Sequence, residues 1–327
     1  MNFHLEFTPR PFDFKLNLRH RLLLVGSCFT EQIGNKLSSH KFQTISNPHG
    51  ILFNPISIAQ SLQSYLEEKQ YRSTDLFFHN ELWGSWDHHT RFSNINAEAC
   101  LQKINQSRSE AAAFIPTTDW VLVTLGSSFV YEQLEGRVVA NCHKVPTDKF
   151  TKKLLSAETI KTTLQSTIQL LHKKNPSARI IFTISPVRHL REGFVENNRS
   201  KANLITAVHE LVSANNQVYY FPAYELVIDD LRDYRFYAED MVHPNHAATN
   251  YVWEKFIAMC IDEPSQQLMK DVSVINAARL HKPFNPSSHA HQSFLRNHLQ
   301  KALELKKQHE FLDLKEEIDF FEREIKT

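Results

Sequence analysis

Five short apolar segments, each followed by glycine, proline or a loop that holds both, most constrain how this chain folds. Their apolar residues run almost without interruption, whereas a strand with one face in water alternates apolar and polar residues. Amphipathic helical patterns separate the segments, and this alternation is typical of a parallel sheet covered by helices on both faces. The predicted strands are residues 21–25, 42–46, 119–125, 179–185 and 217–221.

The helical patterns between these strands complete an α/β domain that we expect to span residues 1–263. A segment rich in aromatic residues, 71–94, predicts a β insertion, and residues 130–145 predict a hairpin. The predicted helices cover residues 30–40, 56–66, 97–114, 157–172, 201–214 and 244–261.

Residues 264–327 form a predicted C-terminal helical extension that differs from the domain in composition. Residues 281–291 hold two prolines and two serines, which indicates a loop, and a charged stretch with apolar residues at helical spacing follows. Packing back on the domain is the first interpretation of this stripe, and self-association into a homo-oligomer is the alternative. Its apolar residues are Leu295, Leu299, Leu303, Leu314, Ile318, Phe321 and Ile325.

Composition excludes several classes of protein. The 37 Lys and Arg residues nearly balance 36 Asp and Glu, so a net charge of +1 argues against nucleic acid as a partner. Only seven glycines occur, and their spacing contains neither the dinucleotide-binding fingerprint nor a P-loop. Apolar runs are far shorter than the ~20 residues that cross a bilayer, so no membrane partner is expected. Four scattered cysteines and a start unlike a signal peptide predict a cytoplasmic protein.

The first candidate for chemistry is Ser27, which follows the first strand and its closing Gly26. A serine on such a turn lies beside the N–H groups of the next helix, which suit a developing oxyanion. A helix N-cap is the structural alternative. Cys28 is a second candidate nucleophile, but alternating side-chain directions predict that it faces the core.

The second candidate is the D-x-x-H sequence that precedes the last predicted helix of the domain. Residues three apart on one turn face each other, so Asp240 can accept a hydrogen bond from Nδ1 of His243. Nε2 is then left as a general base for a serine. A polar loop before a helix is the alternative explanation of the same residues.

Together these two signals follow the plan of the SGNH/GDSL-type hydrolases, and the wording of the motifs resembles one branch, the GSCFA family. The family's first motif reads GSCFT here, with Thr30 in place of the Ala of the family name. Further stretches that resemble the family are NPHGILFNP (47–55), VVANCHKVP (138–146), SPVRH (185–189), ENNRSKANL (196–204) and YFPAYELVIDDLRDYRFYAEDMVHP (220–244). The resemblance covers about residues 20–260.

This resemblance implies a flavodoxin-like three-layer α/β/α sandwich and serine hydrolase chemistry on an ester. Ser27 would be the nucleophile, His243 the base and Asp240 its orienter. In the oxyanion hole, the N–H of Ser27 would be joined by that of Gly50. The superfamily usually has Asn where this chain has Ser128, so the third donor is open, with Asn47 or Asn54 as alternatives.

Other polar residues at the predicted strand ends are candidates for binding substrate. They are Arg188, His189, His143 and Asn47. Arg188 could grip a carboxylate or phosphate, or could hold its loop through an ion pair. Lys201 could bind such a group likewise, with solvation at a predicted helix start as the alternative. Among 18 histidines no zinc-type spacing occurs, so neither a metal nor a cofactor is predicted.

The sequence therefore predicts a serine esterase or deacylase that cleaves a short-chain O-acyl ester, with O-acetyl first and a small molecule or carbohydrate as carrier. An acyltransferase with the same triad remains an alternative, because the two activities differ only in what reaches the acyl-enzyme. A catalytically inactive binding protein on the same fold, and a cysteine hydrolase that uses Cys28, are the others.

Overall fold

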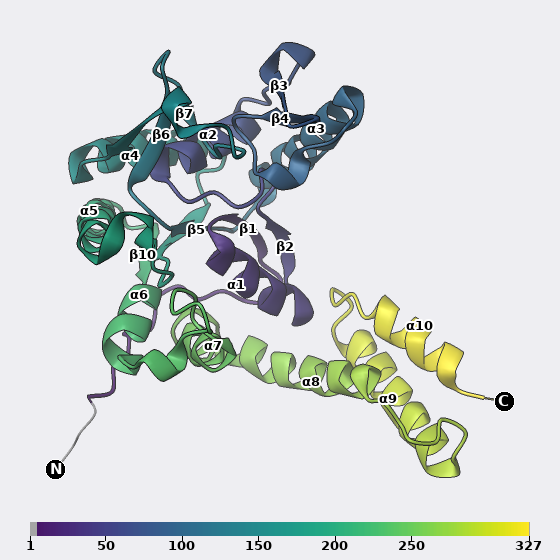
Figure 1. The fold of residues 1–327 in the computed structure, drawn as a ribbon. Helices are drawn as coiled ribbons and strands as arrows, with labels where there is room; N and C mark the ends of the chain where they lie inside the picture. Colours follow the sequence, from purple (N-terminus) through teal and green to yellow (C-terminus); the bar gives the residue numbers. More distant parts are fainter. Residues whose placement is uncertain (1–4, 327) are drawn as a thin grey trace.

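The computed structural model describes residues 5–326, and its centre is a parallel five-stranded sheet in the order β10-β9-β5-β1-β2 (Figure 1). Taken in chain order, these strands give the arrangement 2-1-3-4-5 of flavodoxin-like folds. All five predicted strands are confirmed within one or two residues. They are β1 (Arg21–Gly26), β2 (Gln43–Ser46), β5 (Trp120–Leu125), β9 (Arg179–Ile184) and β10 (Val218–Phe221).

Helices cover both faces of this sheet because successive side chains of each buried strand point to opposite faces. Leu22 and Leu24 of β1 pack with α1 (Cys28–Ser39) and α7 (His246–Cys260). Leu23 and Val25 pack on the other face, in the core that α2 (Pro55–Leu66), α4 (Ala157–Lys174) and α5 (Gly193–Ala214) also fill. The three-layer sandwich expected from the sequence is therefore present.

Two small antiparallel sheets interrupt the sandwich. The first pairs β3 (Leu76–His79) with β4 (Leu82–Ser85) inside the predicted insertion, and α3 (Ala97–Phe114) follows it. The second joins β6 (Phe129–Gln133) to β7 (Val138–Val139), as the predicted hairpin requires, and adds β8 (Phe150–Leu154). No strand was predicted at β8, whose residues are only partly buried or exposed.

Three helices form the C-terminal extension, which reaches away from the sheet in Figure 1. They are α8 (Glu263–Leu280), α9 (His289–Gln308) and α10 (Lys315–Glu324). Leu295, Leu314 and Phe321 of the predicted stripe are buried within the chain, whereas Leu303 is largely exposed. The stripe thus packs mainly on its own chain. No helix in the described part of the chain is both long and apolar enough to cross a membrane.

Short irregular helices fill the region between β10 and α7. They are α6 (Ala223–Glu225), the π-helical turns Leu226–Leu231 and the 3₁₀ turn Tyr234–Phe236. The D-x-x-H segment follows them directly, and Asn245 caps α7 through the N–H of Ala248.

Candidate active site

The candidate site lies where the order of the strands reverses, between β1 and β5. Both strands end at the same edge of the sheet, and ligands of doubly wound folds bind at this switch point. Gly26 closes β1 with a φ of +140°, and a Cβ there would lie 2.2 Å from the carbonyl oxygen of Thr124 on β5. Only glycine allows the two chains to approach so closely, and Ser27 follows at the N-terminus of α1.

The hydroxyl of Ser27 is free. Ser27 stands at the N-cap position of α1, yet its side chain makes no capping hydrogen bond. The residue is fully buried, and its Oγ has no partner among the described residues. A buried polar group normally finds a partner, and leaving one unpaired costs about 1–3 kcal/mol. The N-cap explanation of this serine therefore does not account for its hydroxyl.

A second loop covers the Ser27 turn. The N–H of Leu52 donates to the carbonyl of Gly26 at 2.9 Å, and the N–H of Gly26 donates to Oδ1 of Asn47 at 2.8 Å. Cys28 is partly exposed, so the prediction that it faces the core is wrong. The chain enters α1 at Cys28, and the strand's alternation of side-chain directions ends there. Burial nevertheless raises the pKa of the Cys28 thiol, which disfavours the thiolate that a nucleophile needs.

Asp240 and His243 form the expected pair. Their Oδ2 and Nδ1 atoms lie 2.6 Å apart, and Oδ1 of Asp240 accepts the N–H groups of Val242 and His243. These hydrogen bonds lower the pKa of Asp240 to about 2, so the carboxylate is ionised near neutrality. An ionised Asp240 holds the proton of the neutral imidazole on Nδ1, which leaves Nε2 as the acceptor.

The pair lies at the same sheet edge as Ser27 but is not joined to it. The N–H of Arg188, in the loop after β9, donates to the carbonyl of Val242 at 3.2 Å. In the same loop, His189 packs on Gly126, which follows β5. No hydrogen bond connects the Ser27 hydroxyl with His243 among the described residues. Catalytic hydrogen bonds often tighten only when substrate binds.

Three of the predicted oxyanion donors are occupied elsewhere. The N–H of Gly50 donates to the carbonyl of Asn47 at 2.7 Å. Asn54 caps α2 by accepting the N–H of Ser57, and its amide donates to the Ser57 hydroxyl. Ser128 is buried and donates its hydroxyl to Ser200 on α5. The N–H of Ser27 makes only a long contact, 3.3 Å, with the carbonyl of Thr124.

Asn47 has the free donor that these residues lack. Its Oδ1 is held by the N–H of Gly26, while its Nδ2 is buried without a partner among the described residues. An unpaired amide group fixed beside the Ser27 turn has the chemistry of an oxyanion donor. The sequence named Asn47 for substrate binding and as an alternative donor, and the structure favours the second role.

A cavity of about 260 Å³ opens beside Ser127, directly after β5. Its lining includes Phe53, Phe129, Tyr131, His189 and Lys152. Burial and the neighbouring cations lower the pKa of His189 to about 3, so its ring is neutral, and its buried Nε2 has no partner among the described residues. A larger cavity of about 720 Å³ lies near Ser38 and Arg279, at the opposite end of α1 from Ser27.

Arg188 and His143 differ in their relation to this site. The Arg188 guanidinium lies 4.1 Å from the ring centre of Tyr237 and 4.9 Å from that of Tyr234, and no ion pair holds it among the described residues. His143 does not reach the cavity. Its Nε2 lies 3.0 Å from the carbonyl of Ser85, and its ring packs edge-on against Phe77 and Trp86.

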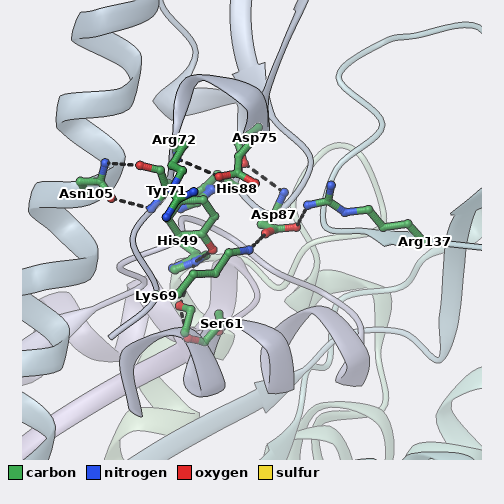
Figure 2. Close-up of polar contacts among 12 residues, drawn as sticks. His49, Ser61, Lys69, Tyr71, Arg72, Asp75, Asp87, His88, Asn105 and Arg137 are labelled. Atoms are coloured by element: carbon green, nitrogen blue, oxygen red, sulfur yellow. Dashed lines mark hydrogen bonds and ion pairs between the residues drawn. The ribbon is translucent and has the colours of Figure 1, made fainter. Parts of the chain in front are cut away.

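His143 borders a cluster of buried histidines under the insertion. His49 stacks on His88 with ring centres 4.0 Å apart, and Tyr65 and Tyr71 hydrogen-bond to the two nitrogens of His49. Figure 2 shows these two histidines beside Tyr71, with Asp87 paired to Lys69 and Arg137. Burial lowers the pKa of His49 to about 3, so the cluster is neutral. Among the described residues no group of three ligating side chains is placed to hold a metal.

Lys201 lies deeper in its helix than the sequence predicts. The helix expected from 201 begins at Gly193, so Lys201 lies two turns inside α5, fully buried rather than solvated. Its Nζ donates to the carbonyls of Gly126 and Ser185, each at 2.6 Å. The motif ENNRSKANL contains Lys201 and was a sequence signal for this position. Apolar periodicity could not predict the burial of Lys201, because the buried face of α5 is polar here.

Comparisons with known proteins agree with the motifs. The model of the GSCFA family matches residues 21–256, and that of the GSCFA domain protein, C-terminal domain, matches residues 272–327. No protein of curated function matches the sequence significantly.

Solved structures show only distant likeness. A carbohydrate esterase family 3 from Talaromyces cellulolyticus shares 9% identity over 77% of this chain and 99% of its own, with a TM-score of 0.37. A family two carbohydrate esterase from Clostridium thermocellum shares 13% over 76% and 64%, with a TM-score of 0.38. An acetyl xylan esterase from Butyrivibrio proteoclasticus shares 13% over 73% and 63%, with a TM-score of 0.36. Likeness at this level assigns no activity to this chain, whereas the family model spans most of its length. The chain therefore belongs to the GSCFA family.

Proposed function

We propose that this protein is an SGNH-type serine esterase or deacylase whose nucleophile is Ser27. The observation that carries the proposal is the Ser27 hydroxyl, which is buried at a helix N-cap and bonded to no described residue. An unpaired hydroxyl at the switch point of a parallel sheet, at the same edge as an Asp–His pair, is what acyl transfer needs.

The reaction follows from the three groups. Ser27 Oγ bonds to the acyl carbon while His243 Nε2 takes the hydroxyl proton, and Asp240 stabilises the imidazolium that forms. The leaving alcohol departs with the proton from His243. Water then attacks the acyl-enzyme with His243 again as base, which releases the acid and restores Ser27. The N–H of Ser27 and the Nδ2 group of Asn47 would donate hydrogen bonds to the negatively charged oxygen of each tetrahedral intermediate.

The proposed substrate is a short O-acyl ester, with O-acetyl first. The cavity beside Ser127, about 260 Å³, offers aromatic walls from Phe53, Phe129 and Tyr131, on which a sugar ring could stack. Trp86, from the insertion, stacks on Phe77 with ring centres 3.8 Å apart. Acetate release from acetylated xylan or acetylated glucose should exceed release from a plain aryl acetate. Equal rates would remove the support for a carbohydrate carrier.

Covalent labelling tests the nucleophile. Intact mass after incubation with a fluorophosphonate should show one adduct on the wild type and none on Ser27→Ala. Cys28→Ala is the matched control, because it changes the next residue and should leave the adduct in place. Loss of the adduct in Cys28→Ala alone would instead identify a cysteine hydrolase.

Two further outcomes separate the alternatives. No adduct on a folded wild type, checked by circular dichroism, would contradict the proposal and favour a binding protein on this fold. If the adduct forms, adding sugar alcohols during turnover distinguishes hydrolysis from transfer. Acyl products on the sugar in place of free acid would identify an acyltransferase.

A further inference from the structure

One face of α5 forms hydrogen bonds with the loops beside the candidate site. Asn197, Ser200 and Lys201 lie at positions i, i+3 and i+4, which share one side of a helix, and all three are buried. We call these three residues the α5 clamp. Their polar atoms turn toward the segments that follow β5 and β9, in place of the apolar contacts usual for a buried helix face.

Each residue of the α5 clamp holds a different part of these segments. Asn197 Oδ1 accepts the N–H of His189 at 2.9 Å. Ser200 Oγ accepts the N–H of Ser128 at 2.8 Å, and its hydroxyl also meets that of Ser127 at 3.2 Å. Lys201 Nζ bonds to the carbonyls of Gly126 and Ser185, which directly follow β5 and β9. The clamp therefore holds the segments that follow both strands against α5.

Lys201 also brings a charge to the site. It forms no ion pair with a carboxylate among the described residues, and it interacts electrostatically with Cys28, the neighbour of Ser27. The charge of Lys201 also contributes to the lowered pKa of His189, which lies beside Gly126. The ammonium group thus lies at the ends of β5 and β9, at the sheet edge where Ser27 also lies.

Resting on the proposed function, we infer that Lys201 is a positioning residue of the esterase site, which holds the ends of β5 and β9 and supplies, when protonated, a positive charge near the oxyanion. This charge would act where Ser128, turned toward Ser200, supplies no donor. It works through space and through the two carbonyls, without contact with the substrate.

Neighbouring groups leave Lys201 free to titrate near neutral pH. Burial lowers the pKa of Lys201 to about 7. Its titratable neighbours are Cys28 from α1, Tyr224 from α6 and His189 from the loop after β9. Burial raises the pKa of Cys28 and of Tyr224 and lowers that of His189 to about 3, so all three stay neutral around pH 7. Lys201 therefore gains its charge as the pH falls through about 7.

The test is the pH dependence of fluorophosphonate labelling at Ser27. Proton transfer to His243 needs an unprotonated imidazole in every variant. Beyond that shared dependence, the labelling rate of the wild type should fall as the pH rises through about 7, because Lys201 loses its charge. Lys201→Met should label about 10²-fold more slowly at pH 6, as expected for a displaced site, and should lack this fall. Lys201→Arg keeps a charge at every pH and should also lack the fall.

Ser200→Ala is the matched control. It loosens the same turn without changing a charge, so it should label more slowly at every pH yet keep the fall near pH 7. Thermal unfolding of each variant shows whether it is folded, and the profile of the wild type stands even if Lys201→Met does not fold.

Several results would overturn the inference. They are a wild type without the fall, a fall that persists in Lys201→Met or Lys201→Arg, and a fall that disappears in Ser200→Ala. In each of these cases the wild type is still labelled, so the proposed function survives. A wild type that is never labelled would overturn both.

Discussion

Ser27 and Asn47 differ from the other predicted oxyanion donors of the candidate site. The hydroxyl of Ser27 and the Nδ2 of Asn47 are buried and have no partner within residues 5–326, while Gly50, Asn54 and Ser128 form hydrogen bonds within the local structure. A fold tolerates the cost of two unpaired groups only where something else is gained. At the scale of single residues, the free donors therefore mark the chemistry better than the identity of the motif does.

Replacing Asn47 and Asn54 by alanine, one at a time, tests this distinction. Asn47→Ala should lower the labelling rate of Ser27 by about 10²–10³, the usual effect of losing one oxyanion donor, with a smaller effect on stability. Asn54→Ala should do the reverse, because it removes an N-cap worth about 1 kcal/mol from α2 and no donor from the site. Labelling kinetics and urea unfolding of both variants measure the two effects. A normal rate in Asn47→Ala would exclude it from the oxyanion hole.

Among the secondary-structure elements, the turn from β1 into α1 is the one that the site cannot lose. The chain must reverse within Gly26 and Ser27 while Gly26 lies against the backbone of Thr124. Any side chain at Gly26 would meet both a positive φ and a backbone oxygen. Gly193, at the start of α5, has a positive φ of +88° but nothing within 4 Å of a built Cβ.

These two glycines form a matched pair. Gly26→Ala should destabilise the protein by about 3 kcal/mol or more, because the clash with Thr124 forces β1 and β5 apart. Gly193→Ala should cost less, about 1–3 kcal/mol, because only the backbone conformation, with φ +88° and ψ 172°, disfavours a side chain there. Urea unfolding compares the two variants with the wild type. Equal destabilisation would show that the close approach to Thr124 has no energetic weight.

For the whole molecule, acid stability depends on the neutral histidine cluster beneath the insertion. His49 and His88 are fully buried, and burial keeps the pKa of both well below 6.5. Between pH 6.5 and the lowered pKa values, His49 and His88 are protonated in the unfolded chain but stay neutral in the folded protein. Stability is therefore complete above about pH 6.5 and is lost as the pH falls below it.

This dependence predicts a measurable loss between pH 7.5 and pH 5.5. Each of the two histidines should remove about 1.4 kcal/mol from the free energy of unfolding over that interval. His49→Gln should reduce this pH dependence, even though it also lowers stability at pH 7.5 by breaking the bonds to Tyr65 and Tyr71. His289→Gln, at an exposed position, should leave it unchanged. Urea unfolding at the two pH values checks this, and an identical loss in His49→Gln would contradict it.

Where the sequence went wrong, the buried contacts are polar or the local signal is ambiguous. The first two turns of α5 were missed because Asn197 and Ser200 bury polar groups, which apolar periodicity cannot detect. The bounds of α8 were not predicted within the helical extension, although Asp262 caps this helix and Pro264 lies in its first turn, a place where proline is tolerated. Position 28 was misjudged because the strand's alternation ends where α1 begins.

The apolar runs and the turns that follow them determined the five-stranded parallel sheet. A strand buried on both faces has a nearly continuous run of apolar residues, which can be recognised in the sequence. The spacing of Asp240 and His243 likewise determined their hydrogen bond, because residues three apart on one turn face each other. Only the tertiary structure decided which polar groups around Ser27 are free, because that depends on partners distant in the chain. Asn47 is free to donate while Ser128 is held by Ser200, and Lys201 is buried among carbonyls, for reasons that no local pattern contains.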